Sequence, residues 1–220
     1  MTRADTLRQT FLETASRMSD GALSPGKSGN FSLRTVDGML ITPTGIPWRD
    51  LTADDVVEVS HDGSVRTGQR LPSSEWRLHL GIYNARDDAR AVMHAHSLHA
   101  TALACLHRSI PAFHYMIAEF GGDRIACSGY ATYGSEELAH LAVKALGSRH
   151  ACLMANHGAI TLGDSLRQAF DRALSLEALA AQYVTALQIG KTKILPAAEM
   201  KRVLAQFKTY GRQTEVRTRR

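Results

Sequence analysis

The chain has 220 residues, of which 44% are hydrophobic and 21% charged, proportions typical of a soluble globular domain. Its formal charge of +5 suits anionic ligands such as phosphate esters. No zinc-finger spacing or aromatic RNA-binding motif accompanies the basic residues, so we expect no nucleic-acid partner. No apolar run reaches the ~18 residues of a membrane span, and the N-terminus lacks the apolar core of a signal peptide. We therefore expect a cytoplasmic protein that does not enter a membrane.

The first third of the chain predicts one helix followed by short strands. Apolar residues at a helical spacing predict a helix over residues 6–20, and Gly21 ends it. Strands are expected at 31–34 and 39–42, joined by a turn that contains Asp-Gly. A rigid Pro- and Gly-containing loop follows, and then a strand at 56–60.

The remainder mixes helices and strands without a regular alternation, which predicts one layered α/β domain over residues 1–220. Serines before Glu75 can cap the first helix of this part, and Ser97 can cap the helix after the next strand. The tail from about residue 212 is expected to be flexible. The expected helices are 75–86, 136–146, 165–189 and 196–210, and the expected strands are 91–96 and 151–154.

The pair His94 and His96 is the sharpest chemical signal in the sequence. Side chains two apart on a strand point to the same face, about 6.6 Å apart, so two imidazoles can converge on one ion. A third imidazole, His157, follows a second buried strand, and a backbone turn at Gly158 could aim it inward. Three such ligands with an open position describe a catalytic divalent site. A His-x-His pair alone is a weak signal, and most of the ten histidines need no metal role.

Three short segments carry glycine, hydroxyl or amide groups that suit a phosphate. Glycine lets backbone amides approach an anion closely, and a helix start adds free amides. Each segment by itself is more often a turn or a cap. None is a Walker loop or a dinucleotide fingerprint. The segments are Ser28-Gly29-Asn30, Thr42-Pro43-Thr44-Gly45 and Ser73-Ser74.

Taken together, these segments resemble the class II aldolase/adducin family over residues 5–212. The resemblance also includes the stretch 109–118 and the segment 130–134. It runs through Gly29-Asn30-Phe31-Ser32, the stretch from Met39 to Pro47, Leu71-Pro72-Ser73-Ser74-Glu75-Trp76-Arg77, His94-Ala95-His96 and Asn156-His157-Gly158.

The resemblance implies specific roles for these residues. It implies one divalent metal per subunit, zinc or alternatively manganese, cobalt or iron, bound by Glu75, His94, His96 and His157. Glu75 would also be the acid/base, and Tyr115 would protonate the aldehyde oxygen in a neighbouring subunit's site. The phosphate would be bound by Gly29, Asn30, Thr44, Gly45, Ser73 and Ser74, and the aldehyde end lined by Tyr133 and Tyr210.

The resemblance further implies a three-layer α/β fold, with a central, largely antiparallel sheet flanked by helices, assembled as a homotetramer with interfacial sites. The implied activity is reversible cleavage of a ketose 1-phosphate, such as L-fuculose 1-phosphate, to dihydroxyacetone phosphate and an aldehyde. A divalent ion can stabilise the negative charge left on the ketose fragment.

Several alternatives remain open at this point. The same chemistry could act on 5-deoxyribulose 1-phosphate or 5-methylthioribulose 1-phosphate. The site could instead serve an epimerase, dehydratase or decarboxylase, and an adducin-like module would bind without catalysis. Departures from the family pattern at Lys27, Ser28, Tyr133 and Asn156 leave the sugar undetermined.

Overall fold

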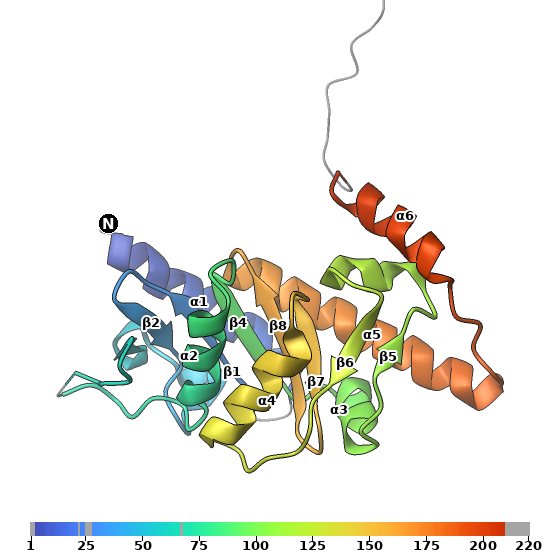
Figure 1. The fold of residues 1–220 in the computed structure, drawn as a ribbon. Coiled ribbons are helices and arrows are strands. Elements are labelled where there is room, and N and C mark those ends of the chain that lie inside the picture. Colours follow the sequence, from blue (N-terminus) through green and yellow to red (C-terminus); the bar gives the residue numbers. More distant parts are fainter. Residues whose placement is uncertain (1–2, 22, 25–27, 67, 210–220) are drawn as a thin grey trace, which may run out of the picture.

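A computed structural model describes residues 3–21, 23–24, 28–66 and 68–209, and its centre is an eight-stranded sheet (Figure 1). The strand order is β3-β2-β1-β4-β8-β7-β6-β5. Strands β6 and β7 run parallel, and the other pairings among the described strands are antiparallel. The strands are β1 (Asn30–Arg34), β2 (Gly38–Ile41), β3 (Val57–Ser60), β4 (Ala91–Ala95), β5 (Ile110–Pro111), β6 (Arg124–Cys127), β7 (Ala151–Met154) and β8 (Gly158–Gly163).

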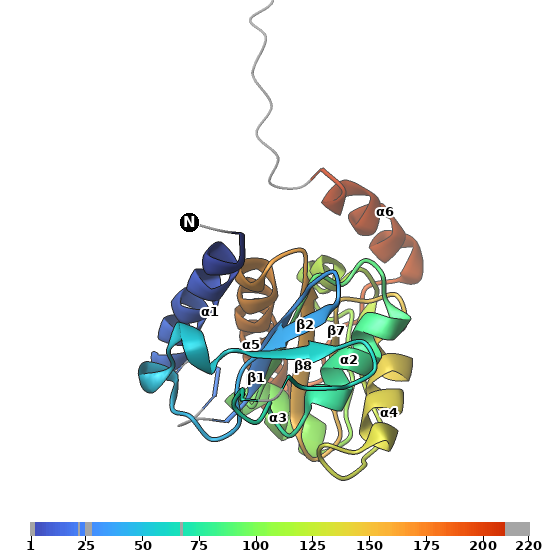
Figure 2. The same ribbon diagram turned by 90° about the vertical axis from the view of Figure 1, so that its left-hand side faces the viewer.

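Helices cover both faces of the sheet, which gives three layers (Figure 2). One face carries α2 (Trp76–Ala85) and α4 (Glu136–Leu146), which pack on each other. The other carries α1 (Arg3–Ser19), α3 (Leu98–Cys105) and the long α5 (Leu166–Ile189). The last helix, α6 (Ala197–Phe207), packs against the short 3-10 helix η3 (Tyr115–Phe120).

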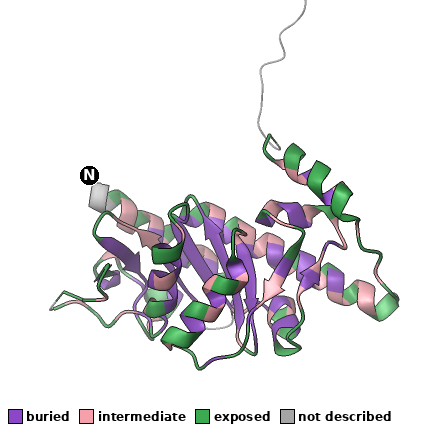
Figure 3. Cartoon of the chain, viewed as in Figure 1, coloured by how far each residue is buried: buried purple, intermediate pink, exposed green. Residues whose placement is uncertain are grey.

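The central strands are buried on both faces (Figure 3). On β4, Met93 packs into the α1 and α5 side, whereas Val92 joins the core under α2 and α4. His94 is two residues from Val92, so it lies on the α2 side, and its side chain is fully buried. The two-residue period of a strand thus determines which helix can meet the histidines.

The predicted α/β class and layered arrangement are confirmed. The elements expected from periodicity occur within a few residues of their predicted bounds, including the hairpin between β1 and β2. Strands β5, β6 and β8 were not predicted. β8 was missed because Ala, Ile, Thr, Leu and Gly in its sequence lack an alternating pattern when both faces are buried.

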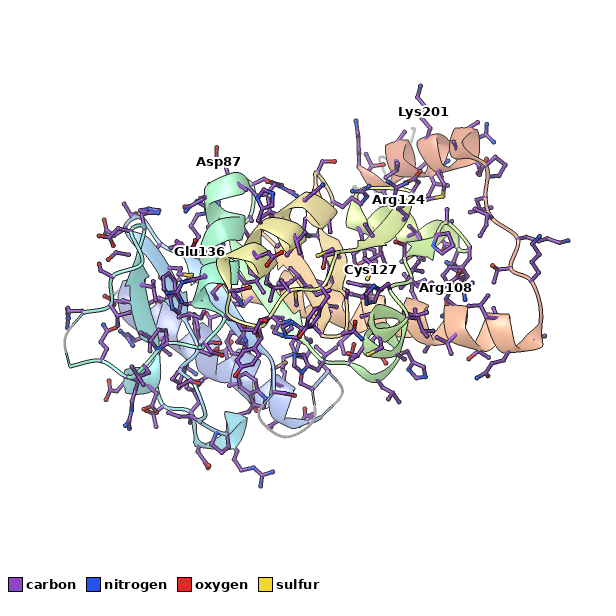
Figure 4. All side chains as sticks on the ribbon, turned by 60° about the horizontal axis from the view of Figure 1, so that its bottom comes forward. Asp87, Arg108, Arg124, Cys127, Glu136 and Lys201 are labelled. Carbon is purple, nitrogen blue, oxygen red and sulfur yellow. The ribbon has the colours of Figure 1, made fainter. Side chains whose placement is uncertain are left out.

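Figure 4 shows Lys201 directed away from the body on α6 and Asp87 projecting beyond the end of α2. None of the helices among the described residues combines the length and the hydropathy that a membrane span requires. The three cysteines are unpaired, in agreement with the absence of a Cys-x-x-Cys motif.

Candidate metal centre

Strand β4 places the imidazoles of His94 and His96 next to each other. His94 lies on β4 and His96 just beyond its end, and their Nε2 atoms are 2.8 Å apart. The Nδ1 atom of His94 lies 3.0 Å from the carbonyl oxygen of Ala159 on β8, and a carbonyl can only accept. His94 therefore donates from Nδ1, and a neutral His94 directs the lone pair of Nε2 toward His96. This carbonyl contact is typical of histidines that ligate metals.

The tight turn between β7 and β8 supplies the third imidazole, His157. The sequence prediction placed the special backbone conformation at Gly158, and this detail was wrong. The left-handed residue is Asn156, with φ of 53°, and its side-chain oxygen accepts from His107 Nε2 at 2.5 Å. Gly158 is needed for another reason, because a Cβ there would lie 2.5 Å from the carbonyl oxygen of Ala95.

Glu75, at the start of α2, contacts the histidines with its carboxylate. It is the N-cap residue of α2 and is 5% exposed. Its Oε2 lies 3.0 Å from His94 Nε2, and its Oε1 lies 3.2 Å from His157 Nε2. The backbone amide of Glu75 donates to the hydroxyl of Ser73 at 3.3 Å, which fixes the helix start.

The donor set fits a divalent cation. Ring nitrogens of His94, His96 and His157 all lie within 4.8 Å of one another, and they form the one such group found in the described part of the chain. Two imidazole lone pairs 2.8 Å apart repel unless a proton or cation lies between them. Nitrogen ligands with one carboxylate suit zinc and several other transition metals.

Burial keeps two of the imidazoles neutral. It lowers the pKa of both His96 and His157 to about 4. Burial by itself would raise the pKa of Glu75, but His94, His157 and the hydrogen bond from Asn30 lower it well below its usual range. An anionic carboxylate beside neutral imidazoles is the state that binds a metal.

Three of the four candidate ligands, Glu75, His96 and His157, line a pocket of 380 Å³. The loop 42–45 reaches the pocket beside residues 71–74, because the amide of Ser73 donates to the carbonyl of Thr42 and that of Thr44 to the carbonyl of Leu71. Gly29 approaches β4 so closely that a Cβ would lie 2.7 Å from the carbonyl oxygen of His94. All six predicted phosphate-binding residues line this pocket, as do Glu75, His96, His157 and Tyr133.

Tyr115 does not line the metal pocket. It is 45% exposed on η3 and lines a separate groove of 520 Å³ between η3 and α6, where its ring lies 6.5 Å from that of Phe207. Tyr210 and Lys27 lie outside the described residues. Another groove of 520 Å³, between α2 and α4, lies on the outer surface and includes His140.

Two residues near the site were missed by sequence reasoning. Glu177 on α5 accepts hydrogen bonds from the backbone amides of His99 and Ala100. It therefore caps the start of α3, the helix that begins two residues after His96. Ser97, which was expected to cap α3, is the N-cap residue but its side chain accepts no hydrogen bond from the helix. His79 lies fully buried behind Glu75 and contacts Asn30. Its position four residues after Glu75, on the same helix face, was the available signal.

Comparisons with known proteins agree with this geometry. Residues 9–184 match the family described as Class II Aldolase and Adducin N-terminal domain. The chain is 47% identical over 205 residues to a 5-methylthioribulose-1-phosphate/5-deoxyribulose-1-phosphate aldolase from Rhodospirillum rubrum, covering 93% of this chain and 92% of the relative. It is 44% identical over 210 residues to L-fuculose phosphate aldolase from Escherichia coli, covering 95% and 97%. A solved L-fuculose 1-phosphate aldolase superposes with a TM-score of 0.89 at 39% identity, covering 94% and 98%.

The chain belongs to the class II aldolase and adducin family. Within that family it is an aldolase, a carbon–carbon lyase that depends on a metal bound by three histidines. The predicted family, fold and enzyme class are therefore confirmed.

Proposed function

We propose that the chain reversibly cleaves ketose 1-phosphates to dihydroxyacetone phosphate and a short aldehyde. The observation that carries this proposal is the convergence of Glu75 and three imidazoles in a pocket whose other end offers amide and hydroxyl donors. A bound divalent cation supplies Lewis-acid stabilisation of the negative charge that develops on the ketose fragment. The curated relatives from R. rubrum and E. coli, with 47% and 44% identity, support this substrate class.

The phosphate would lie against Gly29, Asn30, Thr44, Gly45, Ser73 and Ser74. Ser73 and Ser74 directly precede the N-terminus of α2, where the helix dipole favours an anion. The loop 42–45 lies beside them through its hydrogen bonds to residues 71–73. Anchoring the phosphate there places the reacting carbons of the ketose next to Glu75 and the histidines.

Glu75 would transfer the proton at the carbon that becomes part of dihydroxyacetone phosphate. Its carboxylate is buried and anionic, and Oε1 has no hydrogen-bond partner. An anionic oxygen without a hydrogen bond can accept a proton from substrate. Glu75 would therefore serve as base in synthesis and as acid in cleavage, and would ligate the metal in the resting enzyme.

Tyr115 would serve the aldehyde oxygen in the site of a neighbouring subunit. It lies on an exposed surface and outside its own metal pocket, so it can act in another copy of the chain. We therefore propose a homotetramer with interfacial sites. Tyr133, and Tyr210 from the last residues, would line the aldehyde end.

The aldehyde fragment would end in an apolar group. Two exposed tyrosine rings, Tyr130 and Tyr133, line the pocket together with Ala131, and their exposed fractions are 59% and 68%. Cleavage of fuculose, 5-deoxyribulose or 5-methylthioribulose phosphate releases an aldehyde ending in a methyl or methylthio group. Such an end can pack on an aromatic ring, whereas a second charged group would lose hydration there.

Zinc is the proposed metal, with manganese, cobalt and iron as alternatives.

The test is a cleavage assay with the three ketose 1-phosphates, and with xylulose 1-phosphate as a control whose aldehyde ends in a hydroxyl. We expect stoichiometric dihydroxyacetone phosphate from substrates with apolar ends, and slower cleavage of xylulose 1-phosphate. Conversion of any of these sugars to an epimer or a decarboxylated product, without dihydroxyacetone phosphate, would contradict the proposal.

A further inference from the structure

A chain of four buried polar side chains lies behind Glu75. It joins Asn30 and Ser32 of β1 to His79 and Tyr83 of α2. None of the four is more than 6% exposed. Buried polar groups are costly unless each has a partner, and here every member has one.

The hydrogen bonds of this chain can run in only one direction. The ionised carboxylate of Glu75 only accepts, so the Asn30 amide nitrogen, 2.9 Å from Oε2, donates to it. The amide oxygen of Asn30 then faces His79 Nε2 at 2.5 Å, and His79 must donate from that nitrogen. This fixes the orientation of the amide and the tautomer of the imidazole together.

The far end of the chain completes the pattern. His79 is fully buried, and its ring contacts the neutral side chains of Asn30 and Ser32, so with its proton on Nε2 its Nδ1 accepts the hydroxyl proton of Ser32 at 2.7 Å. The oxygen of Ser32 in turn accepts from the hydroxyl of Tyr83 at 2.8 Å. Each donor therefore points toward the next member, and the series ends on Glu75.

We propose that His79 is a positioning residue, which holds the Asn30 amide with its NH2 group toward Glu75 and the pocket. The proposal rests on the acid/base role proposed for Glu75. If the amide turned over, its carbonyl oxygen would face the carboxylate, and neither group could donate. His79 prevents this because it offers a donor, and no acceptor, to Asn30.

The geometry gives Asn30 two tasks at once. One hydrogen of its NH2 group goes to Glu75 Oε2, and the second remains for a ligand in the pocket that Asn30 lines. Asn30 also faces His94 across the β1–β4 pair. A single amide, oriented from behind by His79, thus connects the carboxylate with the proposed phosphate end of the pocket.

The test compares His79→Gln with His79→Leu in the metal-loaded enzyme. The amide nitrogen of glutamine can replace Nε2 as donor to Asn30, whereas leucine fills similar volume without a donor. For His79→Leu we expect kcat to fall about 100-fold and the inhibition constant of inorganic phosphate to rise, because a small misplacement of a catalytic group has that cost. His79→Gln should restore kcat to within about tenfold of the wild type. Equal losses in the two variants, or no loss in either, would overturn the proposal.

Thr161→Val is the matched control for loss of stability. The Thr161 hydroxyl is also buried and donates to the carbonyl of Ala169, on the opposite face of the sheet. We expect this variant to lose stability with unchanged kcat and unchanged affinity for inorganic phosphate. A parallel fall in kcat in Thr161→Val would show that general loosening accounts for the effect of His79→Leu.

A measurement on the wild type does not depend on catalysis. Long-range ¹⁵N NMR spectra of histidine-labelled protein distinguish the two neutral tautomers of His79. We expect protonated Nε2 and unprotonated Nδ1, and the opposite tautomer would overturn the proposal even if the variants fail to fold. If the wild type cleaves no ketose phosphate, the proposed function fails, while the tautomer and the phosphate affinity still decide the role of His79.

Discussion

The metal pocket and the Tyr115 groove differ in how firmly the fold fixes their side chains. The metal ligands come from β4 and the residue just beyond it, the β7–β8 turn and the start of α2, and they are mostly buried. A carbonyl orients His94, and an amide orients Glu75. Tyr115 lies on the short η3, nearly half exposed, with its ring beside that of His114 at 4.8 Å. In the proposed mechanism, residues of one chain would stabilise the charge on the ketose fragment, and a second chain would supply residues of the aldehyde side.

The largest expected effect comes from removing one metal ligand from the metal pocket. His94→Ala should lose the metal and reduce cleavage by about 1,000-fold or more, because Lewis-acid stabilisation contributes several kcal/mol. Metal content by mass spectrometry and the cleavage rate measure this. His140→Ala on the outer face of α4 is the control, and it should retain both metal and activity. Full activity of a metal-free His94→Ala enzyme would refute the metal role.

A smaller loss is expected from Glu75→Gln, which keeps the shape of the side chain but removes its charge. Turnover should fall about 100- to 1,000-fold, within the usual contribution of a general acid/base. Binding of a hydroxamate analogue of dihydroxyacetone phosphate, measured by calorimetry, should persist. Wild-type turnover in Glu75→Gln would remove the acid/base assignment.

On the exposed side, Tyr115→Phe should reduce cleavage about 100-fold while proton exchange on dihydroxyacetone phosphate continues. Equal loss of both partial reactions would argue against a role confined to the aldehyde. Mixing His94→Ala chains with Tyr115→Phe chains should raise activity above that of either variant alone, because one supplies the tyrosine and the other the metal ligands. Failure of co-refolded mixtures to regain activity would place Tyr115 in its own chain's site.

The last prediction concerns the pH dependence of stability, not turnover, and the buried His79. Burial lowers the pKa of His79 to about 3, whereas an unfolded chain protonates histidine near pH 6.5. The unfolded state therefore binds one more proton between these values, and stability is lost as pH falls through that window. Between pH 7 and pH 4 the free energy of unfolding should fall by about 3 kcal/mol more in the wild type than in His79→Gln. Parallel urea-unfolding results for the two proteins would contradict the lowered pKa.

Local patterns predicted the parts of the site that depend on neighbours in sequence. The two-residue period of a strand was enough to place His94 and His96 on one face, and the capping serines located the start of α2. The assignment of Glu75 needed the family resemblance, because a glutamate at a helix start is usually solvated.

The remaining features depend on contacts between distant segments. Glu177 caps α3 from 77 residues away, and His79 reaches Asn30 across 49 residues. The left-handed conformation at Asn156 depends on its contact with His107 and the close approach of β4 to Gly158. No periodicity in the sequence encodes such pairings, since they arise only when the sheet and helices pack together.

Anomalous diffraction from crystals grown with zinc would show whether the four side chains share one ion. We predict one ion per chain, bound by ring nitrogens of His94, His96 and His157 and a carboxylate oxygen of Glu75, at about 2.0–2.2 Å. An ion bound elsewhere, or no ion in a protein that still cleaves its substrate, would contradict this prediction.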